Sequence, residues 1–212
     1  MFIDLVDDLR CPRPHEETWL VASSDRTEGR DIVQGTLGCP ICRAEYPIRG
    51  GVVWFADAPD ARPAPPVDSD SAADPELAMR LAAFLDLSDA QGFALLAGSW
   101  ASLAPLLRGV APTHLVVLNP AAPLSAGGGI SVLHVANYIP LAAATCRGVA
   151  LDDAHAGPAY LRDAVHVLRP RGRLVAPAST PTPSGATELA RDEHLWVAER
   201  DAAPPKLVPL TR

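Results

Sequence analysis

The sequence has 212 residues, enough for one large domain or for a small and a medium one. Its formal net charge of −7 argues against nucleic acid as the main partner, because phosphate binding requires a basic surface. It contains no apolar run near the roughly 20 residues that span a bilayer and no basic N-terminal region of a signal peptide, so we expect a cytoplasmic protein; peripheral docking on a membrane complex stays open.

Three of the four cysteines lie near the N-terminus, in a pattern typical of metal binding. A structural zinc site needs four tetrahedral thiolate or imidazole ligands, usually supplied as two pairs. Cys39 and Cys42 form one Cys-x-x-Cys pair, whereas Pro14 stands where a partner for Cys11 is expected and His15 follows it. The candidate metal ligands are therefore Cys11, His15, Cys39 and Cys42.

The surrounding residues resemble the short zinc-ribbon family that includes the activator subunit of tRNA and protein methyltransferases. The resemblance rests on Leu-Arg-Cys-Pro (residues 9–12), Leu-Gly-Cys-Pro-Ile-Cys (37–42), Tyr-Pro-Ile (46–48) and Gly-Val-Val-Trp-Phe (51–55). It implies a zinc-ribbon-like β module over residues 1–57. Pro14 departs from the family pattern, so a metal-free module held by its own core is the alternative to bound zinc. A third interpretation treats the Cys39 and Cys42 thiols only as small buried apolar groups.

Residues 58–75 are rich in proline, alanine and aspartate and predict an extended or disordered linker. Asp74, Pro75 and Glu76 then predict a helix start, with an N-cap, a proline in the first turn and an acidic residue behind it. The expected organisation is a module over 1–57, a linker over 58–75 and a second domain over 76–212.

The second domain alternates short apolar runs with helical patterns, which predicts βαβ units and a parallel sheet. Two further strands at the C-terminus, 194–199 and 206–210, predict an antiparallel hairpin around Pro204 and Pro205, and residues 179–185 predict a loop. The other expected strands are 93–97, 114–118, 130–135, 148–151 and 173–176. One expected helix begins at Pro75, and the others cover 102–108 and 158–168.

Three segments of this domain, residues 93–102, 132–141 and 160–175, resemble the Rossmann-like class of S-adenosylmethionine-dependent methyltransferases. The resemblance implies a mostly parallel α/β sheet with a C-terminal antiparallel hairpin. It also implies a cofactor site at the carboxyl ends of the first strands, with a glycine turn, a carboxylate and a further polar residue. The residues at these three positions are Gly98, Asn119 and Asn137.

The cofactor motif of that class is largely lost in this sequence. Leu96 replaces its acid, Trp100 and Ser102 replace two glycines, and Asn119 carries no charge. We expect the Trp100 indole to fill the cofactor pocket. Because each lost charged hydrogen bond costs about 1.5–3 kcal/mol, cofactor binding is doubtful. After the fourth strand, Asp152, Asp153 and His155 could serve acid–base chemistry, but a loop that caps the next helix is favoured.

The sequence therefore favours a pseudoenzyme: a non-catalytic, methyltransferase-like scaffold or accessory subunit that binds other proteins in a larger complex. The alternative is an active methyltransferase with an atypical cofactor pocket. A third hypothesis is that the ribbon activates a separate methyltransferase. Zinc is the metal that the cysteine pattern favours.

Overall fold

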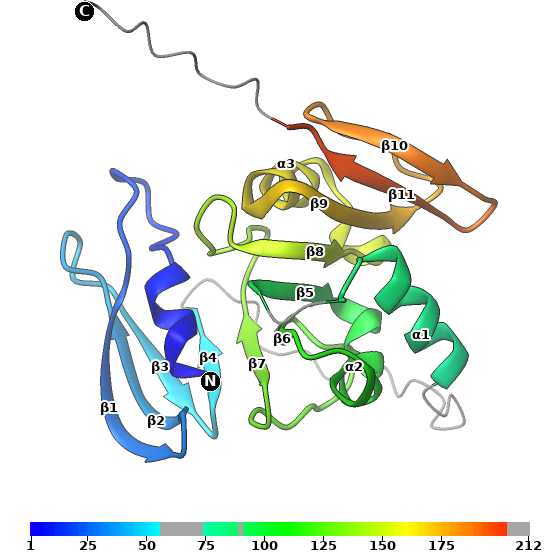
Figure 1. Cartoon of the computed structure of the whole chain (residues 1–212). Helices are drawn as coiled ribbons and strands as arrows, with labels where there is room; N and C mark the ends of the chain where they lie inside the picture. The colour runs from blue at the N-terminus through cyan, green and yellow to red at the C-terminus, as the bar shows by residue number, and fades with distance from the viewer. Residues whose placement is uncertain (56–73, 89–90, 203–212) are drawn as a thin grey trace, which may run out of the picture.

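The computed structural model describes residues 1–55, 74–88 and 91–202. Its strands form one 11-stranded sheet in the order β1-β2-β3-β4-β7-β6-β5-β8-β9-β11-β10 (Figure 1). No helix in the described part of the chain is long and apolar enough to cross a membrane. The predicted linker falls almost entirely outside the described residues.

The N-terminal unit, residues 1–55, begins with a 3₁₀ helix, η1 (Ile3–Asp8). An antiparallel meander follows, formed by β1 (Val21–Glu28), β2 (Asp31–Gly38), β3 (Glu45–Arg49) and β4 (Val52–Trp54). The last strand of the meander, β4, then pairs in parallel with β7, so this unit extends the sheet of the second unit. The sequence had not indicated this pairing.

The second unit, residues 74–202, follows the predicted alternation of strands and helices. Its elements are α1 (Pro75–Phe84), β5 (Phe93–Ala97), η2 (Gly98–Leu103), α2 (Ala104–Val110), β6 (His114–Leu118), β7 (Ile130–His134), β8 (Cys146–Ala150), η3 (Asp153–His155), α3 (Pro158–Val167), β9 (Leu168–Pro177), β10 (Ala186–Arg191) and β11 (Leu195–Arg200). β5 to β9 run parallel, and β11 enters antiparallel between β9 and β10. Numbered from β5, the strand order is 3-2-1-4-5-7-6, a Rossmann-like order with the expected antiparallel hairpin at one end.

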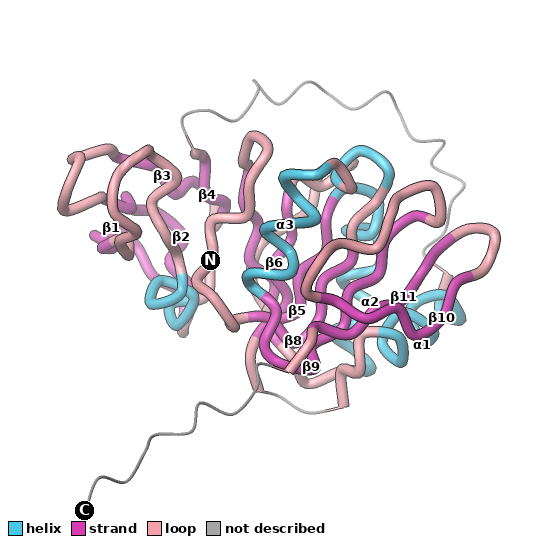
Figure 2. Tube along the Cα trace, turned by 90° about the horizontal axis from the view of Figure 1, so that it is seen from above, coloured by secondary structure: helices cyan, strands magenta, loops and turns pink. Residues whose placement is uncertain are grey.

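Successive side chains of a strand point to opposite faces of the sheet, so the buried side chains form two clusters, one on each face. In β5, Leu95 belongs to the cluster that α3 and the N-terminal unit cover, whereas Leu96 belongs to the cluster that α1 and α2 cover. Figure 2 shows α3 on one side of the strands and the other two helices on the opposite side. Because the N-terminal unit and α3 bury side chains in the same cluster, the two units share one core.

The helix start at residue 74 is confirmed: the Asp74 carboxylate accepts from the backbone N–H of Glu76 at 2.8 Å. The helix expected over 102–108 lies two residues further along, at Ala104–Val110, and follows a 3₁₀ turn. Proline 105 fits this start, because a proline in the first turn of a helix removes no intrahelical hydrogen bond.

The strand predicted over 194–199 is confirmed as β11 (Leu195–Arg200), but its hairpin partner is β10, which precedes it in the chain. The second predicted strand, 206–210, and the predicted turn at Pro204 and Pro205 lie outside the described residues. The turn forms at Asp192, whose Oδ1 accepts from the backbone N–H groups of His194 and Leu195. The sequence did not predict β10, because almost all of its side chains are exposed and it therefore shows no alternation of apolar and polar residues.

Candidate functional site

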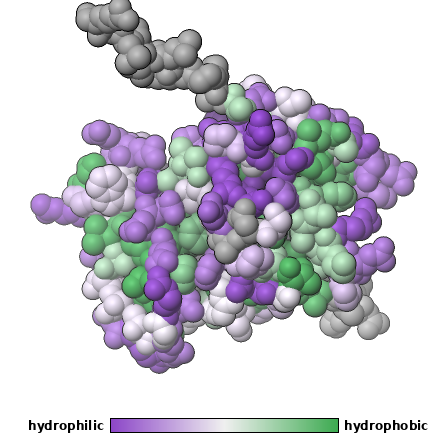
Figure 3. All heavy atoms as spheres, viewed as in Figure 1, coloured by the Kyte–Doolittle hydropathy of each residue, from purple (hydrophilic) through white to green (hydrophobic). Residues whose placement is uncertain are grey.

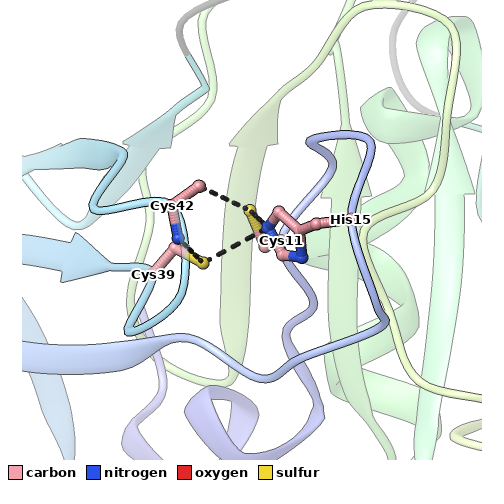
Figure 4. Close-up of side chains that lie close together, drawn as sticks. All are labelled: Cys11, His15, Cys39 and Cys42. Carbon is pink, nitrogen blue, oxygen red and sulfur yellow. Dashed lines mark hydrogen bonds between the residues drawn. The ribbon is translucent and has the colours of Figure 1, made fainter.

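The four candidate metal ligands come together between η1 and the β2–β3 loop (Figure 4). Their ligand atoms all lie within 4.8 Å of one another. The Cys11 and Cys42 sulfurs are 3.7 Å apart, and His15 Nε2 lies 3.2 Å from the Cys11 sulfur and 3.4 Å from the Cys39 sulfur. Zinc–sulfur bonds of about 2.3 Å at tetrahedral angles place two sulfurs about 3.8 Å apart, so this group could hold a metal such as zinc.

Backbone hydrogen bonds hold both loops of the cluster, the one with Cys39 and Cys42 and the one with Cys11 and His15. In the β2–β3 loop, Arg43 adopts a left-handed conformation with a φ of 58°, and its N–H donates to the Cys39 carbonyl, which closes the turn that carries Cys39 and Cys42. In the first half, Cys11 N–H donates to the Thr18 carbonyl, which closes the loop that carries His15. The His15 imidazole thereby lies beside the Cys11 and Cys39 sulfurs, where it could serve as the fourth ligand in place of a thiolate at Pro14.

Two further interactions suit these residues to a metal. His15 Nδ1 lies 2.6 Å from the Glu16 carbonyl oxygen, and a proton on Nδ1 in that hydrogen bond leaves Nε2 available as a ligand. Burial opposes ionisation of the Cys39 thiol, but the backbone N–H groups of Cys42 and Ile41 lower its pKa to about 6. Burial raises the pKa of the Cys11 thiol. The cluster therefore contains one thiol that ionises readily, which is the form that binds metal.

A second group of polar residues lies at the carboxyl ends of the parallel strands, where ligands bind in Rossmann-like sheets. Gly98 follows β5, Asn119 follows β6, and Asp152 follows β8. We call the side chains gathered there the strand-end network; its members are Ser99, Asn119, Asp152, His155 and Tyr160.

Asp152 occupies the space beside the predicted cofactor glycine. Its Oδ2 accepts from the Ser99 backbone N–H at 2.7 Å, and its Oδ1 pairs with His155 Nδ1 at 2.6 Å. A Cβ placed on Gly98 would lie 2.0 Å from Oδ2, so the carboxylate is packed directly against the glycine backbone. Burial opposes ionisation of Asp152, but the hydrogen bonds from His155 and Ser99 lower its pKa overall. The carboxylate is thus held ionised by the protein itself.

Asn119 has its amide engaged by the neighbouring strand end. Its Nδ2 donates to the Val135 carbonyl at 3.0 Å, and its Oδ1 accepts from the Val135 N–H at 2.9 Å. Its φ of 43° lies in the left-handed region, which asparagine tolerates better than most residues. Tyr160 completes the network by donating its hydroxyl to the Ala136 carbonyl. The residue at the expected ribose-binding position therefore ties β6 to the end of β7.

The other predicted residues lie elsewhere. Asn137 is exposed in the bend after β7 and, within the described residues, is not joined to the strand-end network. Trp100 is half-buried against the cluster that includes α1 and α2, whereas Asp152 is the side chain packed against Gly98. Asp152 also caps the 3₁₀ turn η3 by accepting from the His155 N–H. The expectation that this loop caps the next helix is wrong, because α3 begins after Gly157 without a side-chain cap.

The sequence did not predict that the Tyr160 hydroxyl joins this hydrogen-bond network. A tyrosine at an apolar position of a helical pattern does not indicate a polar role. Nor did the sequence predict the contact between Asp152 and Gly98, which are 54 positions apart in the chain. The strained glycine turn after a strand was the one signal that could have indicated a close neighbour there.

No family model matches the sequence, and no curated protein matches it significantly. Among solved structures, the chain is similar to a geranyl diphosphate C-methyltransferase from Streptomyces coelicolor A3(2), with 11% identity, a TM-score of 0.39, and coverage of 48% of this chain and 42% of that one. It is also similar to the antibiotic-resistance methyltransferase Kmr, with 14% identity, a TM-score of 0.41, and coverage of 59% and 93%. The chain spans less than half of the length of several such structures. Because these scores are low, the strand order and directions carry the assignment of the fold.

The second unit has a class I methyltransferase-like fold. That fold covers about half of the chain, and the four candidate metal ligands lie outside it, in the N-terminal unit.

Proposed function

We propose that this chain is a non-catalytic, methyltransferase-like scaffold that binds other proteins in a larger complex. The observation that carries the proposal is the strand-end network. The Asp152 carboxylate lies against Gly98 and accepts from Ser99 N–H, and Asn119 is hydrogen-bonded to Val135. A nucleotide cofactor seated beside Gly98 would have to displace an ionised carboxylate from three hydrogen-bond donors, which opposes binding.

Calorimetric titration of the full chain with S-adenosylmethionine and with its demethylated product tests this proposal. We expect no heat of binding at millimolar cofactor. Micromolar binding would contradict the scaffold and favour a methyltransferase with an atypical pocket. The Asp152→Ala variant sharpens the test, because weak binding that appears only in this variant would identify the carboxylate as the obstacle.

The surface of the N-terminal unit supports the protein-binding part of the proposal. Ile3, Trp19 and Val21 are large apolar side chains, exposed by 43%, 61% and 56%. They border one hollow of about 630 Å³ between η1 and the start of β1, and β1 is an edge strand of the sheet. Figure 3 shows apolar surface among polar side chains over this unit, on the left. An exposed tryptophan beside an unpaired strand edge is typical of a docking surface.

Affinity capture from the native cell, with the Trp19→Ser variant beside the wild type, tests the docking surface. We expect a defined partner to co-purify with the wild type in fixed stoichiometry and to be lost with the variant. The Met79→Ser variant is the matched control, because Met79 is 64% exposed on α1, far from this surface in the sequence. A partner retained equally by all three proteins would contradict this assignment.

We further propose that Cys11, His15, Cys39 and Cys42 bind one structural zinc ion. The donor set and its spacing support zinc, because three thiolates and one imidazole at tetrahedral separations match its preferred ligands. Elemental analysis of the purified protein should find close to one equivalent of zinc, and the Cys39→Ser variant should lack it. A chain free of metal after purification in zinc-containing buffer would favour the metal-free alternative.

A further inference from the structure

A groove between α3 and the loop after β9 lies apart from both sites described above. It has a volume of about 690 Å³, within the range of roughly 300–1,000 Å³ typical of small-molecule sites. We call it the α3 groove. Its lining consists of Ala156, Pro158, Leu161, Arg162, Val165, His166, Ser179, Thr180, Pro181, Pro183, Ser184 and Arg200.

The apolar part of the α3 groove follows from the fold. A parallel sheet normally has helices over both faces, but the connection from β9 to β10 contains no helix. Only a loop therefore lies next to α3 there, and the α3 side chains Pro158, Leu161 and Val165 line the groove at helical spacing, opposite two loop prolines. These surfaces would bury a hydrocarbon or aromatic body.

The ionisable side chains that line the groove are all basic. Arg162 and Arg200 line the groove together with His166, and none of the lining residues is acidic. Arg200 Nη1 donates to the carbonyl oxygens of His166 and Leu168, which fixes the guanidinium at the end of α3. Asp163 is not part of the lining: its Oδ2 accepts from the Ile139 backbone N–H, and its Oδ1 forms an ion pair with the Arg162 guanidinium at 3.0 Å. Arg162 is therefore already compensated, whereas Arg200 forms no ion pair with an acidic side chain among the described residues that line the groove. An apolar hollow with basic side chains and no acid complements an apolar anion.

We infer that the α3 groove binds a small amphipathic carboxylate, with its apolar body against α3 and the loop prolines and its carboxylate beside Arg200. The loop is held in place from the far side, because the buried Trp196 donates its indole N–H to Thr180. The groove is thus bordered by a helix and an anchored loop, which lowers the ordering cost of binding. This inference is independent of the proposed scaffold function and of the zinc site.

Titration calorimetry of the full chain with dodecanoate, and separately with its uncharged methyl ester, tests the inference. We expect dodecanoate to bind at micromolar concentration and the ester to bind about tenfold more weakly, because it lacks the charge-assisted hydrogen bonds. No binding of dodecanoate, or equal binding of the ester, would overturn the inference.

Two variants then place the ligand. Arg162→Glu reverses a charge on a side chain that is 74% exposed, and Ser184→Trp fills the groove from an exposed loop position, so both chains should fold. We expect each to weaken dodecanoate binding about tenfold or more, while the control Arg80→Ala, on α1, leaves it unchanged. Thermal unfolding of each variant verifies the fold. Folded groove variants that bind dodecanoate as the wild type does would overturn the inference.

Discussion

At the scale of single residues, two side chains decide the character of the two sites. His15 lies beside the Cys11 sulfur, where it could replace the ligand that Pro14 cannot supply, and Asp152 occupies the space beside Gly98. The first could be read from the sequence, because the cysteine pattern left one ligand missing and His15 stood next to the gap. The second could not, because an aspartate in a loop gives no sign of what it packs against.

His15→Ala should lower the affinity for zinc at least about tenfold. Even the loss of a residue that only orients a ligand typically costs about 10–100-fold, and His15 is a proposed ligand itself. Competition with a chromophoric chelator measures the change. His194→Ala is the control, because its side chain is 78% exposed and far from the cluster in the sequence. Equal affinities in the two variants would remove His15 from the ligand set.

Gly98→Ala should destabilise the protein more than Gly29→Ala does. The two glycines have similar positive φ values, 62° and 59°, but a Cβ meets Asp152 at position 98 and nothing within 4 Å at position 29. The displaced carboxylate should add about 1–3 kcal/mol to the cost of the backbone strain, as overpacking does. Urea unfolding of both variants measures the difference.

Comparing Gly98→Ala with Gly29→Ala in an Asp152→Ala background isolates the contact between the new methyl group and the Asp152 carboxylate. There the extra cost of Gly98→Ala should largely disappear, because the carboxylate that the methyl group meets is gone. If the extra cost persists, the strain at Gly98 has a source other than Asp152.

At the scale of elements, aromatic stacking joins the N-terminal unit to β6 and β7 of the second unit. Trp54, in β4, stacks on His134, in the neighbouring β7, with 4.1 Å between the ring centroids. Phe2 stacks in the same way on His114, at the start of β6. Burial lowers the pKa of both histidines, so each imidazole is held neutral where the units meet.

Stability should therefore fall as the pH drops below about 6.5. In the unfolded chain His134 gains its proton near its ordinary pKa of 6.5, whereas in the folded protein it stays neutral to lower pH. Between those two pKa values the unfolded state binds more protons, so stability decreases with falling pH. Urea unfolding at about pH 7.5 and about pH 5.5 measures the slope. His134→Phe should reduce it, and an unchanged slope would show that His134 does not cause it.

At the scale of the whole molecule, β4 and β7 make one sheet out of two units. Residues 52–54 pair with residues 132–134, and side chains of both units enter one hydrophobic cluster. A shared core predicts that the units stay together without a covalent link.

A protease site inserted between residues 64 and 65 tests that prediction. After cleavage, residues 1–64 and 65–212 should co-elute in size-exclusion chromatography at micromolar concentration, because the paired strands and buried stacking hold them together. Val53→Asp places a charge in the shared cluster, where the side chain is fully buried, and should separate the fragments. Wild-type fragments that separate at the same concentration would contradict a shared core.

The sequence by itself determined the elements whose signals are local. The cap at Asp74, the apolar runs of β5 and β6 and the cysteine spacing each depend on neighbours within a few positions, and the structure has them as expected. Tertiary structure alone decided the β4–β7 pairing, the exposed strand β10 in the hairpin, and the carboxylate packed against Gly98. Each of these depends on which distant side chains meet when the sheet closes, and one strand's own pattern does not contain that information.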